Sequence, residues 1–167
     1  MGIKANPGFK NSTVPGPRPL VLKFLDPPLG MTAQNPNKAC LEALLLFSPQ
    51  RVYIHLCGND INIATTPKEI AENILDLVRY IKVNGVPDVM VGEILMRGGI
   101  FEKSPGMTKE IYKKMKNRVN TILRSKLAHC FIFLLMKFPD DFAADGVHVA
   151  DSKLWKHAVQ IRRALLR

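Results

Sequence analysis

The segment Asp145-Gly146-Val147-His148 places a carboxylate three residues before an imidazole near the end of the chain. A carboxylate at this spacing can bind one ring nitrogen, which fixes the tautomer and supports the cation formed during proton transfer. The other ring nitrogen can then act as a general base. The same spacing also occurs in plain surface loops, where an Asp-Gly pair makes a turn. The motif therefore needs support from elsewhere in the sequence.

A second polar group follows an apolar run, V-Y-I-H-L-C, which leads into Gly58, Asn59 and Asp60. The amide of Asn59 can donate to a developing oxyanion, a contact worth roughly 3 kcal/mol in the barrier. The backbone N–H of Gly30 is a candidate second donor, because glycine permits close approach of a ligand. A simple turn is the alternative, since Gly, Asn and Asp are the usual turn residues.

These residues need a scaffold that brings distant positions together. Apolar runs predict four strands, at 20–25, 52–57, 89–95 and 129–136. Capping residues and helical spacing predict four helices, from Asn35-Pro36 to Ser48, from Thr66 to Asn84, from Thr108 to Leu127 and from Asp151 onward. Strands that alternate with helices indicate parallel pairing. We therefore expect a three-layer α/β/α domain over residues 20–167, preceded by an irregular lead-in over residues 1–19.

A parallel sheet gathers the carboxyl ends of its strands at one edge, which is where ligands of open α/β sheets bind. Gly30, Asn59, Arg97 and the loop 139–148 all follow predicted strands. We therefore expect them to share that edge. Arg97 is a candidate contact for an anionic group of a substrate, and a solvated side chain is the equal alternative.

The order and context of these motifs resemble those of the SGNH (GDSL-type) hydrolases, an ester-hydrolysing family with a flavodoxin-like fold. Cys57-Gly58-Asn59-Asp60 resembles the family's G-x-N-D motif, Asp145-Gly146-Val147-His148 matches its D-x-x-H motif, and Gly30 fits its glycine motif. The resemblance covers about residues 20–167. It implies that His148 is the general base, that Asp145 orients it, and that Asn59 and Gly30 are the oxyanion donors. It implies no metal and no cofactor.

The family's first motif, a strand that ends in G-D-S, has no counterpart in the sequence. Ser12 is the only serine before residue 20, and it follows Pro7-Gly8 rather than a strand. Ser48, Ser104, Ser125 and Ser152 do not occupy the motif's place in the order. We therefore expect either a chain whose nucleophile strand lies outside this sequence, or a degenerate relative that has kept the scaffold without activity.

The net charge of +10 raises a second hypothesis, a non-catalytic α/β module that binds nucleic acid or another acidic partner. Basic residues crowd two predicted helices: Lys109, Lys113, Lys114, Lys116, Arg118, Arg124 and Lys126 in one, and Lys153, Lys156, Arg162, Arg163 and Arg167 in the other. They would form one basic surface if both helices packed on the same face of the sheet, and a solvated helix face is the alternative. No aromatic ladder accompanies these charges in the sequence, so base stacking is not expected.

The remaining features indicate a cytoplasmic protein without nucleotide or zinc motifs. The sequence has no P-loop, G-x-G-x-x-G or H-E-x-x-H motif. It also has no apolar signal segment at its start and no apolar run of membrane-spanning length. Three widely spaced cysteines in apolar runs indicate buried, reduced thiols. The substrate and the oligomeric state remain open.

Overall fold

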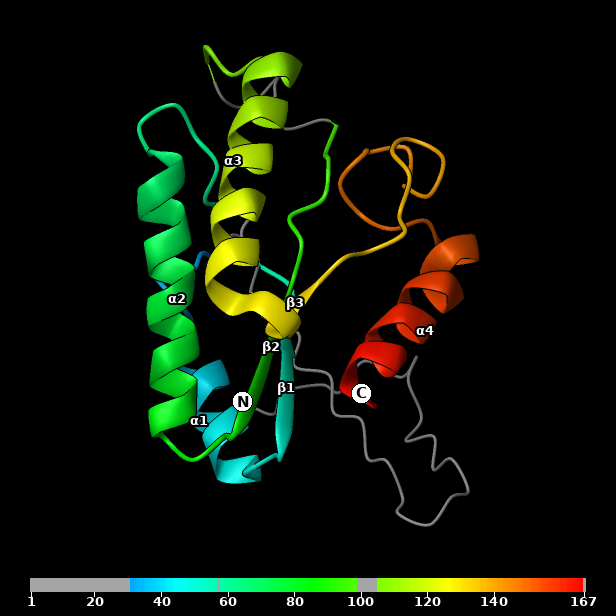
Figure 1. Ribbon diagram of the computed structural model, residues 1–167. Helices are drawn as coiled ribbons and strands as arrows, with labels where there is room; N and C mark the ends of the chain where they lie inside the picture. The colour runs from blue at the N-terminus through cyan, green and yellow to red at the C-terminus, as the bar shows by residue number, and fades with distance from the viewer. Residues whose placement is uncertain (1–30, 57, 99–104, 167) are drawn as a thin grey trace, which may run out of the picture.

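The computed structural model describes residues 31–56, 58–98 and 105–166, which form layers of helix around a parallel sheet (Figure 1). The lead-in 1–19, the predicted strand 20–25, Ser12 and Gly30 lie outside the described residues, and so does Cys57.

The sheet of the described residues has three parallel strands in the order β1-β2-β3. They are β1 (Arg51–Ile54), β2 (Asp88–Gly92) and β3 (Phe131–Ile132). The helices between and around them are α1 (Lys38–Phe47), α2 (Pro67–Val83), α3 (Lys109–Leu127) and α4 (Leu154–Leu165). Short 3₁₀ turns at Ala128–Cys130 and Asp151–Lys153 precede β3 and α4. The predicted three-layer α/β/α architecture is confirmed.

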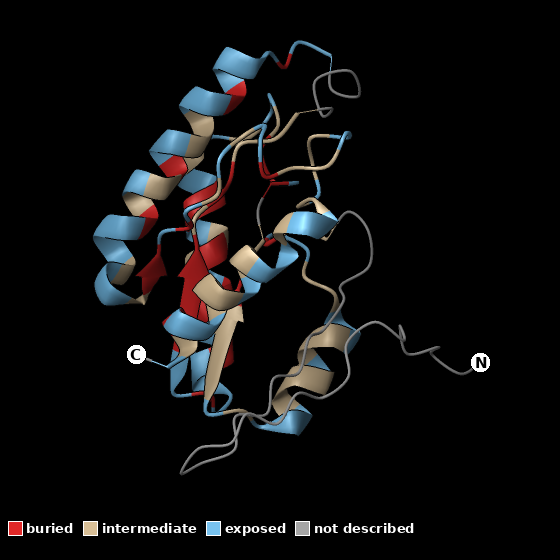
Figure 2. Cartoon of the chain, turned by 90° about the vertical axis from the view of Figure 1, so that its right-hand side faces the viewer, coloured by how far each residue is buried: buried red, intermediate tan, exposed pale blue. Residues whose placement is uncertain are grey.

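Alternating side chains of each strand enter two separate cores. On one face, Val89 and Val91 pack with the apolar sides of α2 and α3, and α1 covers this cluster through Leu44 and Leu45. On the other face, Met90 and Ile132 pack with Ala164 of α4. Buried residues accordingly concentrate in the strands and on the helix faces turned toward them (Figure 2). A sheet covered on both faces explains why the strand sequences are almost continuously apolar.

The two long helices begin at the residues that their capping sequences predict. Thr66 accepts from the Glu69 backbone N–H, and the Glu69 carboxylate accepts from the Thr66 N–H, so α2 starts with a complete capping box. Thr108 caps α3 by accepting from the N–H of Ile111. Both helices end where the periodic apolar pattern ends, at Val83 and Leu127.

The first predicted helix boundary is wrong by two residues. The N-cap of α1 is Asn37, whose side chain accepts from the Cys40 N–H at 2.9 Å. Asn35 instead lies in the preceding loop, where its own N–H donates to the Thr32 hydroxyl oxygen at 3.0 Å. Asparagine is suited to both positions, so its residue type alone could not choose between them.

The strands are shorter than the apolar runs that predicted them. β2 ends at Gly92, although the Glu93 N–H still donates to the Ile132 carbonyl at 2.9 Å. Beyond this bond, side chains bind the backbone N–H groups that follow β3. The Glu93 carboxylate accepts the Leu134 N–H at 3.0 Å, and the Gln160 side-chain oxygen accepts the Leu135 N–H. The run 129–136 therefore holds only the two paired residues of β3.

The two basic helices lie on opposite faces of the sheet (Figure 1). The core side chains of α3, including Val119 and Leu123, belong to the cluster shared with α2. Ala164 of α4 belongs to the other cluster. The single basic surface that would combine both helices is therefore ruled out. In the described part of the chain, no helix has the combination of length and apolar character that crossing a membrane requires.

Candidate active site

Asp145 and His148 form a closed pair on the loop between β3 and α4. His148 Nδ1 lies 2.5 Å from Asp145 Oδ2, and Asp145 Oδ1 accepts the backbone N–H groups of His148 at 3.0 Å and Val147 at 2.8 Å. The hydrogen bond from the His148 ring, together with these two backbone groups, lowers the pKa of Asp145 to about 2. The carboxylate is therefore ionised at neutral pH and holds Nδ1, which leaves Nε2 directed away from it.

Hydrogen bonds within the loop that carries this pair stabilise its conformation. The Ala143 N–H donates to the His148 carbonyl at 2.8 Å, and residues Phe142 and Val149 form an antiparallel bridge. The buried Asp141 carboxylate accepts the Lys137 N–H at 2.7 Å and binds the Lys156 ammonium of α4. The Lys156 hydrogen bond lowers the pKa of Asp141. The position of His148 is thus fixed relative to α4.

Asn59 follows β1 on an exposed turn, with both ends of its amide engaged. Its Nδ2 donates to the Met31 carbonyl at 3.2 Å, and its Oδ1 accepts from Arg97 Nη1 at 2.9 Å. These partners assign the amide orientation, because a carbonyl can only accept and a guanidinium can only donate. The amide nitrogen carries two hydrogens and Met31 takes one, so the group keeps the chemistry of an oxyanion donor.

Arg97 lies directly over the buried Gly58 rather than extending into solvent. A Cβ at position 58 would lie 2.1 Å from Arg97 Cζ and 2.2 Å from its Nε. Glycine is therefore what lets the guanidinium reach the Asn59 amide. The sequence had suggested Arg97 as a substrate contact, and the structure adds a contact with Asn59 that no spacing rule could reveal, because 38 residues separate the two.

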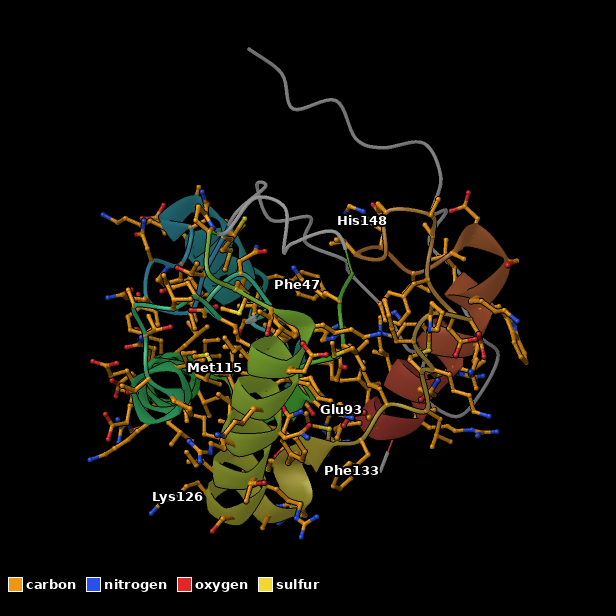
Figure 3. The ribbon with its side chains drawn as sticks, turned by 90° about the horizontal axis from the view of Figure 1, so that it is seen from above. Phe47, Glu93, Met115, Lys126, Phe133 and His148 are labelled. Atoms are coloured by element: carbon orange, nitrogen blue, oxygen red, sulfur yellow. The ribbon has the colours of Figure 1, made fainter. Side chains whose placement is uncertain are left out.

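The backbone after β2 connects the two halves of the site. Arg97 reaches Asn59, and the N–H of the next residue, Gly98, donates to the Gly146 carbonyl at 2.7 Å. Asn59 and the Asp145–His148 pair therefore lie at the same carboxyl edge of the sheet, joined through residues 97 and 98. In the view onto this edge, His148 lies on the side of its loop nearer to the rest of the domain (Figure 3). Gly30, the predicted second donor, lies outside the described residues.

Side chains of α3 hydrogen-bond to the backbone of the segment that precedes Arg97. Asn120 accepts the Ile94 N–H at 2.9 Å and donates to the Ile94 carbonyl at 3.0 Å, so its amide pairs with this residue as a strand would. The Tyr112 hydroxyl donates to the Leu95 carbonyl at 3.3 Å. The segment 94–97 is thus ordered without being part of a regular strand.

Burial shifts the pKa values of two titratable groups beneath this edge, one acid and one base. Asp60 accepts the Ala33 N–H at 2.9 Å, but burial outweighs this bond and raises the pKa of the carboxyl. Burial lowers the pKa of His55 to about 3, and nearby His157 and the Arg97 guanidinium act in the same direction. His55 is therefore neutral and pairs edge-on with His157 at 5.3 Å between ring centroids. It belongs to the packing below the site.

The described serines do not complete the pair. Ser48 is the C-cap of α1, before the amino end of β1, and Ser125 lies in the last turns of α3. Ser152 lies in the 3₁₀ turn that precedes α4. None of these three hydrogen-bonds to His148 in the described structure.

No protein-family model and no curated protein matches the sequence. Among solved structures, the chain is similar to a Bacteroides fragilis protein provisionally described as an acylhydrolase, with 21% identity and a TM-score of 0.63 over 82% of this chain and 71% of that one. It is also similar to TesA, with 20% identity and a TM-score of 0.57 over 81% of this chain and 73% of that one. The likeness is one of fold: the chain shares the α/β architecture of these two structures.

Proposed function

We propose that this domain is an ester hydrolase of the SGNH type, with His148 as general base, Asp145 as its orienting carboxylate and Asn59 as an oxyanion donor. The observation that supports the proposal most strongly is the joint position of these residues. Asn59 and the hydrogen-bonded Asp145–His148 pair, 86 residues apart in the chain (145 − 59 = 86), share one edge of the sheet through Arg97 and Gly98. The acylhydrolase-like fold is consistent with this role.

The chemistry follows from the positions of the polar atoms. His148 Nε2 removes the proton of an attacking hydroxyl, whose oxygen bonds to the ester carbonyl carbon while the carbonyl becomes an oxyanion. The imidazolium that results is stabilised by the ionised Asp145. When the oxyanion collapses, the C–O bond to the alcohol breaks and the imidazolium returns its proton to the leaving oxygen. When the attacking oxygen belongs to a side chain, water then attacks the resulting acyl ester with the same base and donor, which releases the acid and restores the hydroxyl.

The oxyanion would be stabilised by the Asn59 amide. Its Oδ1 is held by Arg97, so the amide cannot rotate without breaking that bond. Removal of one such donor typically slows the chemical step about 10²–10³-fold. The role of Gly30 as a second donor remains part of the proposal.

The attacking hydroxyl is not assigned to a described residue. The family pattern would place it on a serine after a strand, and Ser12, the serine before residue 20, does not fit that pattern because it follows Pro7-Gly8. A water molecule activated by His148 would use the same base and the same donor at a lower rate, since a site without its serine retains only the contributions of binding and electrostatics.

Turnover of a short-chain nitrophenyl ester tests the proposal. Wild type and the His148→Ala variant are compared with His129→Ala, which removes an exposed imidazole from the turn before β3. We expect turnover by wild type and by His129→Ala, and at least a 100-fold loss in His148→Ala. Equal rates in wild type and His148→Ala would overturn the assigned role of His148.

A further inference from the structure

One flank of α3 carries a row of exposed cations that faces the chain after β3. Lys109, Lys113 and Arg124 lie at the four- and eleven-residue spacings that keep side chains on one side of a helix. Asn120, at an intermediate position of the row, binds the Ile94 backbone, which shows that this side of α3 is turned toward the sheet edge. We call Lys109, Lys113, Arg124 and Phe133 the α3–β3 strip.

Aromatic rings mark both ends of this strip. The Arg124 guanidinium carbon lies 5.9 Å from the centroid of the Phe133 ring, and the Lys109 ammonium lies 5.6 Å from that of Phe138. Phe133 is 56% exposed even though it is a large apolar residue. It directly follows β3 at the edge of the described sheet and packs edge-on against the buried Phe131 at 5.3 Å. The structure thus brings together aromatic and basic residues that are separate in the sequence.

The cations of the strip lack acidic partners. In the described structure, carboxylates form ion pairs with basic residues of α1, α2, α4 and β1, but none lies within ion-pair distance of a cation of α3. Glu93 is half-buried, its carboxylate accepts the Leu134 N–H, and its charge acts on Lys116. Like charges four residues apart, such as Lys109 and Lys113, destabilise a helix. A partner with opposite charge would remove that repulsion.

The dimensions of the strip suit an extended polyanion. Arg124 lies 15 residues after Lys109 (124 − 109 = 15), so the row spans roughly 22 Å at 1.5 Å per residue. Its upper end reaches Phe138, whose ring lies against Gly98 and Gly146 of the candidate active site. Its lower end is the exposed Phe133. A ligand that satisfies the whole strip needs regularly spaced negative charges and at least one flat apolar group.

We propose that the α3–β3 strip binds single-stranded nucleic acid, with the cations on phosphates and the Phe133 ring stacked on a base. A groove of positive charge bordered by aromatic side chains is the arrangement that proteins use to bind single strands without sequence preference. A duplex keeps its bases stacked on each other, so it can use the cations but not Phe133. The inference does not depend on the proposed hydrolase activity.

Fluorescence anisotropy with a labelled oligothymidylate of about 12 nucleotides tests this proposal, since single-strand sites span about 4–16 nucleotides. The strip variant is Lys109→Gln/Lys113→Gln/Arg124→Gln. Its matched control is Lys114→Gln/Arg118→Gln/Lys126→Gln, which removes the same charge from the other side of the same helix. Figure 3 shows Lys126 and Phe133 on opposite sides of α3. All six side chains are exposed, and a thermal melt confirms that each variant is folded.

We expect wild type to bind at about 50 mM salt, with an affinity that falls as salt is raised. The strip variant should lose at least tenfold in affinity and about 2 from the slope of log K against log salt, since each single-strand phosphate contact contributes about 0.7. The control should bind within about threefold of wild type. Phe133→Ala should weaken binding to the single strand about fivefold or more and leave binding to a duplex of equal length unchanged.

Four results would overturn the proposal. The first is no binding at low salt, and the second is an equal loss in the strip variant and its control. The third is an unchanged affinity of Phe133→Ala for the single strand. The fourth is binding to anionic phospholipid vesicles that depends on the same three cations while the oligonucleotide does not bind.

Discussion

The Gly98 N–H donates to the Gly146 carbonyl across 2.7 Å, and this bond brings the loop after β2 against the loop that carries His148. The approach requires glycine at position 146 and leaves little room for a side chain at position 98. A Cβ on Gly146 would lie 2.8 Å from Gly98 Cα, and one on Gly98 would lie 3.3 Å from Gly146 Cα. Gly146 also has φ +63°, a backbone conformation that residues other than glycine rarely adopt.

Gly146→Ala should therefore both destabilise the loop and lower ester turnover. The left-handed backbone alone costs roughly 1–2 kcal/mol with a side chain, and the clash with Gly98 backbone atoms adds to it. Gly85→Ala is the matched control, because Gly85 has φ +100° but nothing lies within 4 Å of its added Cβ. Urea unfolding should show a larger loss for Gly146→Ala than for Gly85→Ala. Equal losses would mean that the contact between the two loops contributes nothing.

Arg97 and Gly58 should act as one unit in positioning Asn59. Arg97→Ala removes the donor to Asn59 Oδ1, and Gly58→Ala places a methyl group where the guanidinium lies. The displaced atoms are the flexible end of a side chain, so Gly58→Ala should change stability little. We expect each variant to lower kcat for an ester about tenfold, and the double variant to lose no more than either single one. Multiplicative losses would show that Gly58 does not act through Arg97.

Buried imidazoles should make the domain sensitive to acid. The folded-state pKa of His55 is about 3, below its usual 6.5, so the unfolded chain binds a proton that the folded chain does not. Stability is therefore unaffected by this group above about pH 6.5 and falls by roughly 1.4 kcal/mol per pH unit below it, until the pH approaches the folded-state value. Burial lowers the pKa of His157 as well, which acts in the same direction.

The measurement is the free energy of unfolding of wild type and His55→Gln between about pH 7 and pH 4.5. As the pH falls, the free energy of unfolding of wild type should decrease relative to that of His55→Gln. The raised pKa values of Asp60 and Glu93 oppose the trend in wild type, but they cancel in this difference. His129→Gln, at an exposed position, should follow the wild-type curve. If the difference in unfolding free energy between wild type and His55→Gln did not change with pH, the lowered pKa of His55 would be contradicted.

The sequence predicted the fold because its local signals agree with the packing. The N-cap residues and apolar spacing of α2 and α3 define these helices, and the alternation of helix and strand indicates a parallel sheet. The strand lengths could not be predicted, because the side chains of Glu93 and Gln160, from distant positions, accept the Leu134 and Leu135 N–H groups after β3. An apolar run shows that a segment is buried, but not whether its backbone pairs with another strand.

The sequence predicted individual groups of the candidate site but not the tertiary contacts between them. The D-x-x-H spacing predicted the contact between Asp145 and His148, which is local. The contact of Arg97 with Asn59 and the aromatic partner of Arg124 depend on tertiary packing. Phe133 carries no signal in the sequence because it lies in an apolar run, where its exposure could not be read. The sequence shows no aromatic ladder beside these charges, and the two phenylalanine rings that lie near Lys109 and Arg124 come from the chain after β3.

The most direct test of the proposed hydrolase is a kinetic cycle on Asp145 and His148. Ester kcat is measured for wild type, Asp145→Asn, His148→Ala and the double variant. If Asp145 acts by holding the imidazole, its substitution should slow wild type by a factor of 10² or more and should have no effect once His148 is absent. An unchanged rate in Asp145→Asn, or an equal further loss in the double variant, would contradict the account.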